Sequence, residues 1–237
     1  MIWKQKLILY GCEALGLGMF MFSAGVFDIL IDHPDLWVRQ HLYSAIARRF
    51  FIGFSMGLTA LGIMFSPFGK KSGAYINPSV TIVRYCLGEI NLLDCIFYCI
   101  SQFIGGAIGM YWVVLILPDW VAHPAINYIV TIPPKNGQTL AFILEFLISF
   151  LLILTVLFTG KSKFWNKYIP FFVAILITLY ITFEAPYSGM SMNPARTFAS
   201  AIVANQWNSF WIYCTAPVLG MLAGEEIYKR VVKSLSL

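Results

Sequence analysis

At residues 73–79 the sequence reads Gly-Ala-Tyr-Ile-Asn-Pro-Ser, and at residues 189–195 it reads Gly-Met-Ser-Met-Asn-Pro-Ala. Each stretch leads into an apolar segment, Ile76–Leu87 or Met190–Val203, that is shorter than the about 20 helical residues needed to cross a bilayer. Asn-Pro is a favourable helix start, because asparagine caps free backbone N–H groups and proline is tolerated at the first helical position. Two such starts on two undersized segments predict a pair of half-helices that reach only the middle of a membrane.

The composition places the whole chain in a membrane. Of its 237 residues 59% are hydrophobic and only 11% are charged, whereas an average soluble domain is about a quarter charged. This balance excludes an ordinary soluble domain, a disordered chain and a nucleic-acid-binding protein. We expect an all-α membrane protein, because a helix satisfies its own backbone hydrogen bonds in lipid. Six apolar stretches are predicted to span the bilayer: Leu7–Phe27, Phe50–Phe68, Cys95–Leu117, Thr139–Gly160, Tyr168–Phe183 and Trp207–Gly224.

The two short segments divide the chain into two matching halves. Each follows the second span of a three-span set, and the first span of each set carries one glutamate, Glu13 or Glu145. Because an odd number of spans separates equivalent points, the halves have opposite orientations and form an inverted repeat. We therefore predict one domain over residues 1–237, with repeat 1 at about 1–117 and repeat 2 at about 138–237. The half-helices enter from opposite sides, and their amino-terminal ends meet near the midplane.

Positive charge predicts the orientation of the chain. Most of its 16 Lys and Arg residues lie in the amino-terminal segment, the connections between spans two and three and between spans four and five, and the carboxy-terminal tail. The positive-inside rule then places both termini in the cytoplasm, in a plasma or inner membrane. The net charge of +5 thus follows from topology and gives no reason to expect nucleic-acid binding.

The sequence carries no motif for catalysis or metal binding. The five cysteines lie in apolar segments and are interpreted as small hydrophobic residues, and the three histidines (His33, His41 and His123) lie in predicted loops. Because neither a metal-binding nor a catalytic motif is present, we expect a protein that is not an enzyme and has no metal or other cofactor. Asp28, Asp32 and Asp35 predict an acidic, solvated first outer loop.

The sequence resembles the aquaporin (major intrinsic protein) family over essentially its whole length. The resemblance is carried by Ser-Gly-Ala-Tyr-Ile-Asn77-Pro78-Ser79-Val-Thr and by Ser-Gly-Met-Ser-Met-Asn193-Pro194-Ala195-Arg196-Thr, together with Glu13, Glu145 and Gln102. It implies a passive, single-file water channel that excludes ions and protons, and a homotetramer with one pore in each subunit. The resemblance also implies that the Asn77 and Asn193 amides face the pore.

Arg196 is the most informative single residue. It occupies the third position of a helix that begins at Pro194, where the helix dipole disfavours a cation, so a functional role is expected. The resemblance makes it the cation-repelling arginine of a selectivity filter, which Ile181 and Met190 would complete together with either Met56 or Ser55. Val80 occupies the equivalent position in the first repeat.

The remaining residues leave the solute open. Ile181 stands where strict water channels usually have a histidine, so a channel for glycerol or another small neutral solute is the alternative. Against a glycerol channel, Thr197 and Ala201 stand where those members have an aspartate and a basic residue. Glu13 and Glu145 are interpreted, with Gln102, as buried supports for the two Asn-Pro loops, although a proton relay in a secondary transporter is also possible.

Overall fold

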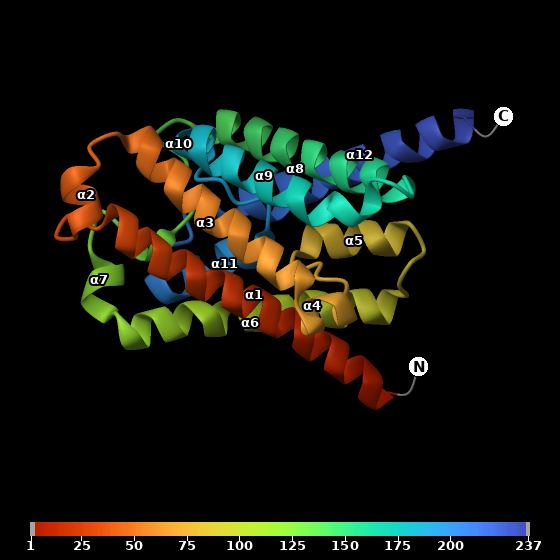
Figure 1. Cartoon of the computed structure of the whole chain (residues 1–237), viewed down its shortest axis with the longest axis horizontal. Helices are drawn as coiled ribbons and strands as arrows, with labels where there is room; N and C mark the ends of the chain where they lie inside the picture. Colours follow the sequence, from red (N-terminus) through yellow and green to blue (C-terminus); the bar gives the residue numbers. More distant parts are fainter. Residues whose placement is uncertain (1–2, 236–237) are drawn as a thin grey trace.

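A computed structural model describes residues 3–235 and shows a bundle of helices, with no β-strand within that range (Figure 1). Six helices are long: α1 (Trp3–Asp32), α3 (Ala45–Phe65), α6 (Leu92–Ile116), α8 (Gln138–Lys161), α9 (Ile169–Phe183) and α12 (Phe210–Leu235). Two shorter helices begin at the Asn-Pro motifs: α5 (Pro78–Cys86) and α11 (Pro194–Ala204). Short connecting helices complete the described chain: α2 (Trp37–His41), α4 (Pro67–Ser72), α7 (Pro118–Ala122), η1 (Asn127–Ile129), η2 (Asn166–Tyr168) and α10 (Ala185–Ser188).

The predicted architecture of six spanning helices and two half-helices is confirmed. Five segments of the described chain are long and apolar enough to cross a membrane: Trp3–Asp32, Ala45–Phe65, Leu92–Ile116, Gln138–Lys161 and Asn166–Phe183. The sixth predicted span lies in α12, which continues beyond its apolar half into a charged stretch. The start of α1 and the end of α12 lie toward the same end of the bundle, and α5 lies nearer that end than α11 does (Figure 1).

The two half-helices begin at the Asn-Pro motifs, at Pro78 and Pro194, and not at the first apolar residue of each short segment. Ile76 and Met190 lie in irregular segments before the helices and have positive φ values. Helix begins only where the asparagine side chain can cap it: the Oδ1 atom of Asn77 accepts from the Ser79 N–H at 2.9 Å, and that of Asn193 accepts from the Ala195 N–H at 3.0 Å. Hydropathy did not separate the apolar pre-helical residues from the helix that follows.

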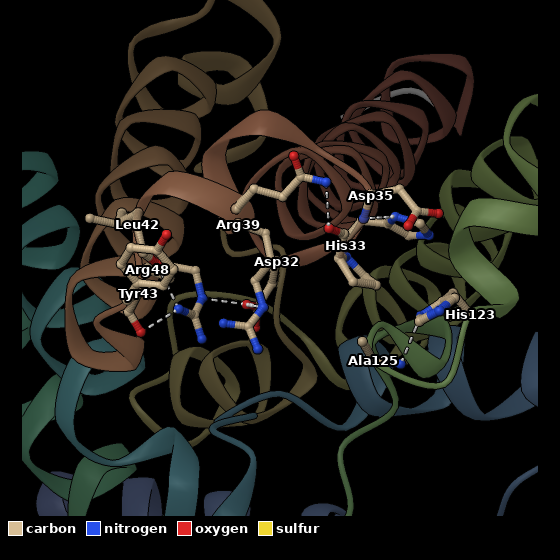
Figure 2. Close-up of polar contacts among 11 residues, drawn as sticks. Asp32, His33, Asp35, Arg39, Leu42, Tyr43, Arg48, His123 and Ala125 are labelled. Atoms are coloured by element: carbon tan, nitrogen blue, oxygen red, sulfur yellow. Dashed lines mark hydrogen bonds and ion pairs between the residues drawn. The ribbon is translucent and has the colours of Figure 1, made fainter.

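The first outer loop is also shorter than predicted. Helix α1 continues to Asp32, so Asp28 and Asp32 are helical residues, and the prediction that they lie in a solvated loop is wrong. Asp32 is stabilised by two arginines, since its Oδ1 atom lies 2.5 Å from the Nε of Arg48 and 3.5 Å from the Nε of Arg39 (Figure 2). These ion pairs offset the unfavourable position of a negative charge at the carboxyl end of α1.

Small residues allow the long helices to approach closely. Helix α1 packs along α6, and α8 packs along α12 at the equivalent place of the second repeat. A Cβ atom at Gly105 or Gly109 would overlap the backbone of α1, and one at Gly220 would overlap the backbone of α8 at Phe146. The close contacts between helices in each repeat therefore depend on these glycines.

Replacing Gly105 by alanine is expected to destabilise the protein by about 1–3 kcal/mol, because the added methyl group must push α1 away from α6. The measurement is the apparent melting temperature in detergent. Gly62→Ala is the matched control: Gly62 lies exposed in α3 with open space where its Cβ would be. Equal melting temperatures for the two variants would contradict the packing argument.

Candidate functional site

A cavity of about 620 Å³ lies between the two repeats. Its wall reaches from Lys70 and Arg84, near the start of α1, to Asp32 and Arg49 at the other end of the bundle. The structure brings most of the predicted pore residues together on this wall: Asn77, Asn193, Arg196, Ile181, Met190 and Met56. Of the two residues offered for the remaining filter position, Met56 lines the cavity, while Ser55 is not on its wall.

The two Asn-Pro loops meet in the middle of the cavity and bind each other. The side-chain Nδ2 of Asn77 donates to the Met192 carbonyl at 2.7 Å, and the Nδ2 of Asn193 donates to the Ile76 carbonyl at 2.8 Å. Each amide group carries two N–H donors, so one of them joins the two repeats and the other is left for the cavity. The amino-terminal ends of α5 and α11, which carry the positive ends of the helix dipoles, therefore face each other at this point.

The remaining motif residues do not line the cavity. Pro78, Ser79, Pro194 and Ala195 are buried at the starts of the two half-helices. Their contribution is to fix the helix starts, through the proline ring at the first position and the capped backbone N–H groups that follow. The Oγ atom of Ser79 is itself buried with no hydrogen-bond partner in the described chain.

Glu13 holds the first loop in its unusual conformation. Its fully buried carboxylate accepts from the backbone N–H groups of Tyr75 at 3.1 Å and Ile76 at 2.6 Å. Gln102 donates to the same carboxylate at 2.7 Å and to the Thr81 hydroxyl at 2.9 Å. Because Glu13 does not line the cavity, its hydrogen bonds support the loop from behind.

Glu145 does the same for the second loop. It is also fully buried, and it accepts from the backbone N–H groups of Ser191 and Met192, each at 2.7 Å, and from the Ser188 hydroxyl at 2.8 Å. Glu145 is likewise absent from the cavity wall. The two glutamates thus make equivalent contacts in the two repeats.

A second pair of supports was missed by the sequence reasoning. The Tyr98 hydroxyl donates to the Ser72 carbonyl at 3.0 Å, and the Tyr213 hydroxyl donates to the Ser188 carbonyl at 2.5 Å. Each serine directly precedes a left-handed glycine, Gly73 or Gly189. The repeated Ser-Gly pair was the signal in the sequence that could have pointed to these contacts. The partner tyrosines could not be predicted, because they lie on helices distant in the sequence.

Arg196 is held by a connection that the sequence did not single out. Its Nη1 atom donates to the Thr131 hydroxyl and, at 3.4 Å, to the Ile129 carbonyl. Asn127, Tyr128 and Ile129 all have positive φ values, between 44° and 52°, a conformation that costs non-glycine residues about 1–2 kcal/mol each. The segment before Thr131 is therefore strained, and it presents its acceptors to Arg196.

The cavity wall that includes the asparagines and Arg196 also has apolar side chains. Ile181 comes from α9, Met56 from α3 and Met190 from the loop before α11. Within residues 3–235, no group of three or more His, Cys, Asp or Glu side chains is placed to hold a metal ion.

Comparison with known proteins identifies this arrangement. The model of the major intrinsic protein family matches residues 12–228. The chain belongs to this family. Members of the major intrinsic protein family are channels and not enzymes, so the prediction of a family member without catalytic activity is confirmed.

The relatives agree with this assignment. Aquaporin-4 of Bos taurus is 30% identical over 182 residues, which are 76% of this chain and 55% of that relative. Aquaporin-8 of Notomys alexis is 31% identical over 235 residues, or 94% of this chain and 84% of that relative. The chain spans about half the length of the aquaporin-4 relatives that it matches. The crystal structure of the aquaglyceroporin from Plasmodium falciparum has the same fold, with a TM-score of 0.82, 18% identity and coverage of 97% of this chain and 98% of that one.

Proposed function

We propose that this major intrinsic protein is a passive water channel with a single-file pore. The observation that carries the proposal is the pair of asparagine amides, which meet in the cavity at the positive ends of two opposed half-helices. A passing water would turn its oxygen toward both remaining N–H donors and could then not accept a proton along the file. Positive half-helix ends and an arginine are the barrier by which aquaporin-type pores exclude protons and cations.

The filter proposal rests on Arg196 with Ile181, Met190 and Met56. A fixed positive charge on a narrow wall repels cations, and three apolar side chains give an ion no replacement for its hydration shell. Water and small neutral solutes lose far less on entering such a ring. We therefore assign selectivity to the half of the pore that contains Arg196.

The same proposal includes the domain organisation, the orientation in the membrane and the oligomeric state. Residues 1–237 would form one channel domain in a lipid bilayer, with both termini in the cytoplasm of a plasma or inner membrane. Both the positive-charge bias and the position of the start of α1 and the end of α12 at one end of the bundle support this orientation. We also propose a homotetramer, consistent with the exposed apolar faces of α3 and α9, which carry Phe50, Phe54, Leu58, Phe171, Ile175 and Leu179.

Stopped-flow light scattering on vesicles with the reconstituted protein tests the proposed solute. We expect fast shrinkage in an impermeant osmolyte, and glycerol entry at the rate of protein-free vesicles. Fast glycerol entry would overturn the water-only assignment and favour a channel for small neutral solutes. Absence of both fluxes in correctly inserted protein would contradict a passive pore for either solute.

The glycerol alternative rests on Ile181, an apolar side chain on the same cavity wall as Arg196. Ile181 cannot hydrogen-bond water, and an apolar wall suits the carbon backbone of a polyol. Against it, Thr197 is buried with its hydroxyl 2.5 Å from that of Ser191, and Ala201 is buried and uncharged. We therefore keep water as the proposed solute.

A proton-coupled transporter is less well supported. Glu13 and Glu145 are the candidate carriers of a proton, yet each is occupied by backbone N–H groups of a pore loop and lies off the cavity wall. Glu13→Gln is therefore expected to lower expression and stability. We expect no pH-driven solute flux in either the wild type or the variant, because a passive pore does not couple solute flux to protons. Loss of a measurable pH-driven solute uptake in this variant would favour the transporter.

A further inference from the structure

Two side-chain amides join the connection before α8 to the residues that follow α11. The Gln206 Nε2 donates to the Asn127 Oδ1 at 2.8 Å, and the Asn127 Nδ2 donates to the Gln206 Oε1 at 3.3 Å. The two residues lie 79 positions apart in the sequence, and both are half-buried. This amide pair (Asn127 and Gln206) therefore fastens together two connections that are distant along the chain.

Gln206 is fixed to the same helix that carries Arg196. Helix α11 ends at Ala204, and Asn205 follows it in the left-handed conformation with a φ of 51°. The backbone N–H groups of Asn205 and Gln206 both donate to the Ala201 carbonyl in the last turn of the helix. Such an arrangement closes the carboxyl end of a helix. One short helix thus positions the arginine near its start and the Gln206 amide just beyond its end.

The segment that begins at Asn127 is strained and is held at both ends. Asn127, Tyr128 and Ile129 have φ values of 44°, 52° and 51°, although residues other than glycine routinely adopt this conformation only singly. At the far end Thr131 packs against Gly189, where a Cβ atom would lie 2.8 Å from the Thr131 Cγ2. Because strained backbone persists only where its surroundings hold it, the amide pair is a restraint at the Asn127 end.

The strained segment provides the acceptors for the arginine. The Arg196 guanidinium donates to the Ile129 carbonyl and the Thr131 hydroxyl, and within residues 3–235 its hydrogen bonds go to this segment alone. Ile129 also lines the cavity, whereas neither residue of the amide pair does. The helix, the arginine, the strained segment and the amide pair therefore form a closed ring of contacts, and the amides can act on the pore only through the other members of the ring.

We propose that Asn127 and Gln206 are positioning residues for Arg196. Their amide pair holds Ile129 and Thr131 in place as acceptors, which keeps the guanidinium against the cavity wall and out of the path of water. The inference rests on the proposed function of a water channel and adds a support to its filter. Without the pair, the segment relaxes and the arginine loses its acceptors. Its five N–H donors then bind water in the cavity, and the side chain obstructs the pore.

Replacing Gln206 by methionine removes the amide while keeping the length of the side chain. We expect the water permeability of reconstituted vesicles, at equal amounts of inserted protein, to fall about threefold or more on loss of these hydrogen bonds. Gln138→Met is the matched control. The Gln138 Nε2 also joins two distant segments, since it donates to the Ser209 Oγ at 2.9 Å, but neither residue belongs to the ring around Arg196. This control should conduct water as the wild type does.

The Arg196→Val variant separates positioning from general support of the fold. It contains no arginine to be positioned, so adding Gln206→Met should leave its water permeability unchanged. A residue that merely stabilises the fold would lower the permeability in both backgrounds. An equal fall in both backgrounds, or a Gln206→Met variant that conducts water as the wild type does, would overturn the proposal.

A wild type that conducts no water would instead contradict the proposed function. Hydrogen exchange then still tests the positioning role, because it reports local opening of the backbone without any flux. Exchange in a peptide covering residues 126–131 should be faster in Gln206→Met than in the wild type or in Gln138→Met. Equal exchange in all three proteins would overturn the positioning role.

Discussion

Replacing Arg196 by valine should raise glycerol permeability by about tenfold or more, the effect of removing about 1.4 kcal/mol from the barrier. The variant copies the first repeat, where Val80 occupies the equivalent position. The substitution removes the charge and much of the side-chain volume from a cavity wall that also includes Ile181, Met190 and Met56. The measurement is the rate of vesicle swelling in glycerol at equal amounts of reconstituted protein.

Arg84→Val is the control for this experiment. Arg84 also lines the cavity, but at the opposite end, where it lies 2.8 Å from Glu89 and over the ring of Tyr75. Its removal takes away the same charge and the same volume from a place that we do not assign to the filter. Equal glycerol rates for the two variants would contradict the assignment of selectivity to Arg196.

Replacing Glu145 by glutamine should strongly destabilise the protein, with a loss of about 1–3 kcal/mol for each backbone donor left without its acceptor. The carboxylate accepts from Ser191, Met192 and Ser188 at 2.7–2.8 Å in a fully buried place. A glutamine has one carbonyl oxygen and would turn an NH₂ group toward donors of the same kind. The measurement is the apparent melting temperature of the purified protein in detergent.

Glu184 provides a matched control for the same substitution. It lies just beyond α9 and is only 8% exposed, yet neither of its carboxylate oxygens has a hydrogen-bond partner in the described chain. Glu184→Gln should leave the melting temperature unchanged or raise it, because a neutral amide costs less to bury than a carboxylate. A larger loss for Glu184→Gln than for Glu145→Gln would contradict the assigned support of the second loop.

Much of the architecture could be predicted because its signals are local or repeated. The Asn-Pro pairs mark helix starts through capping, which involves only neighbouring residues. The matching positions of Glu13 and Glu145 expose the repeat without any knowledge of distant contacts. Hydropathy then places the long helices, but the predicted sixth span ends at Gly224, well before the end of α12 at Leu235.

What the sequence could not supply are contacts between distant segments. The first span was predicted to end at Phe27, because Asp28 and Asp32 were interpreted as solvated charges. In the structure, Arg48 from the next long helix binds Asp32. Thr131 lies in a connection without any motif, and only the folded chain brings it to Arg196. Ile76 and Met192 likewise have positive φ values, and their N–H groups donate to glutamates from other helices, Glu13 and Glu145.

The temperature dependence of water permeability in reconstituted vesicles tests the central claim most directly. Water in a pore exchanges one set of hydrogen bonds for another at the two asparagines and never enters hydrocarbon. We therefore predict a permeability well above that of protein-free vesicles, with a clearly weaker temperature dependence. A temperature dependence as steep as that of the bare bilayer would contradict a continuous water pore through this fold.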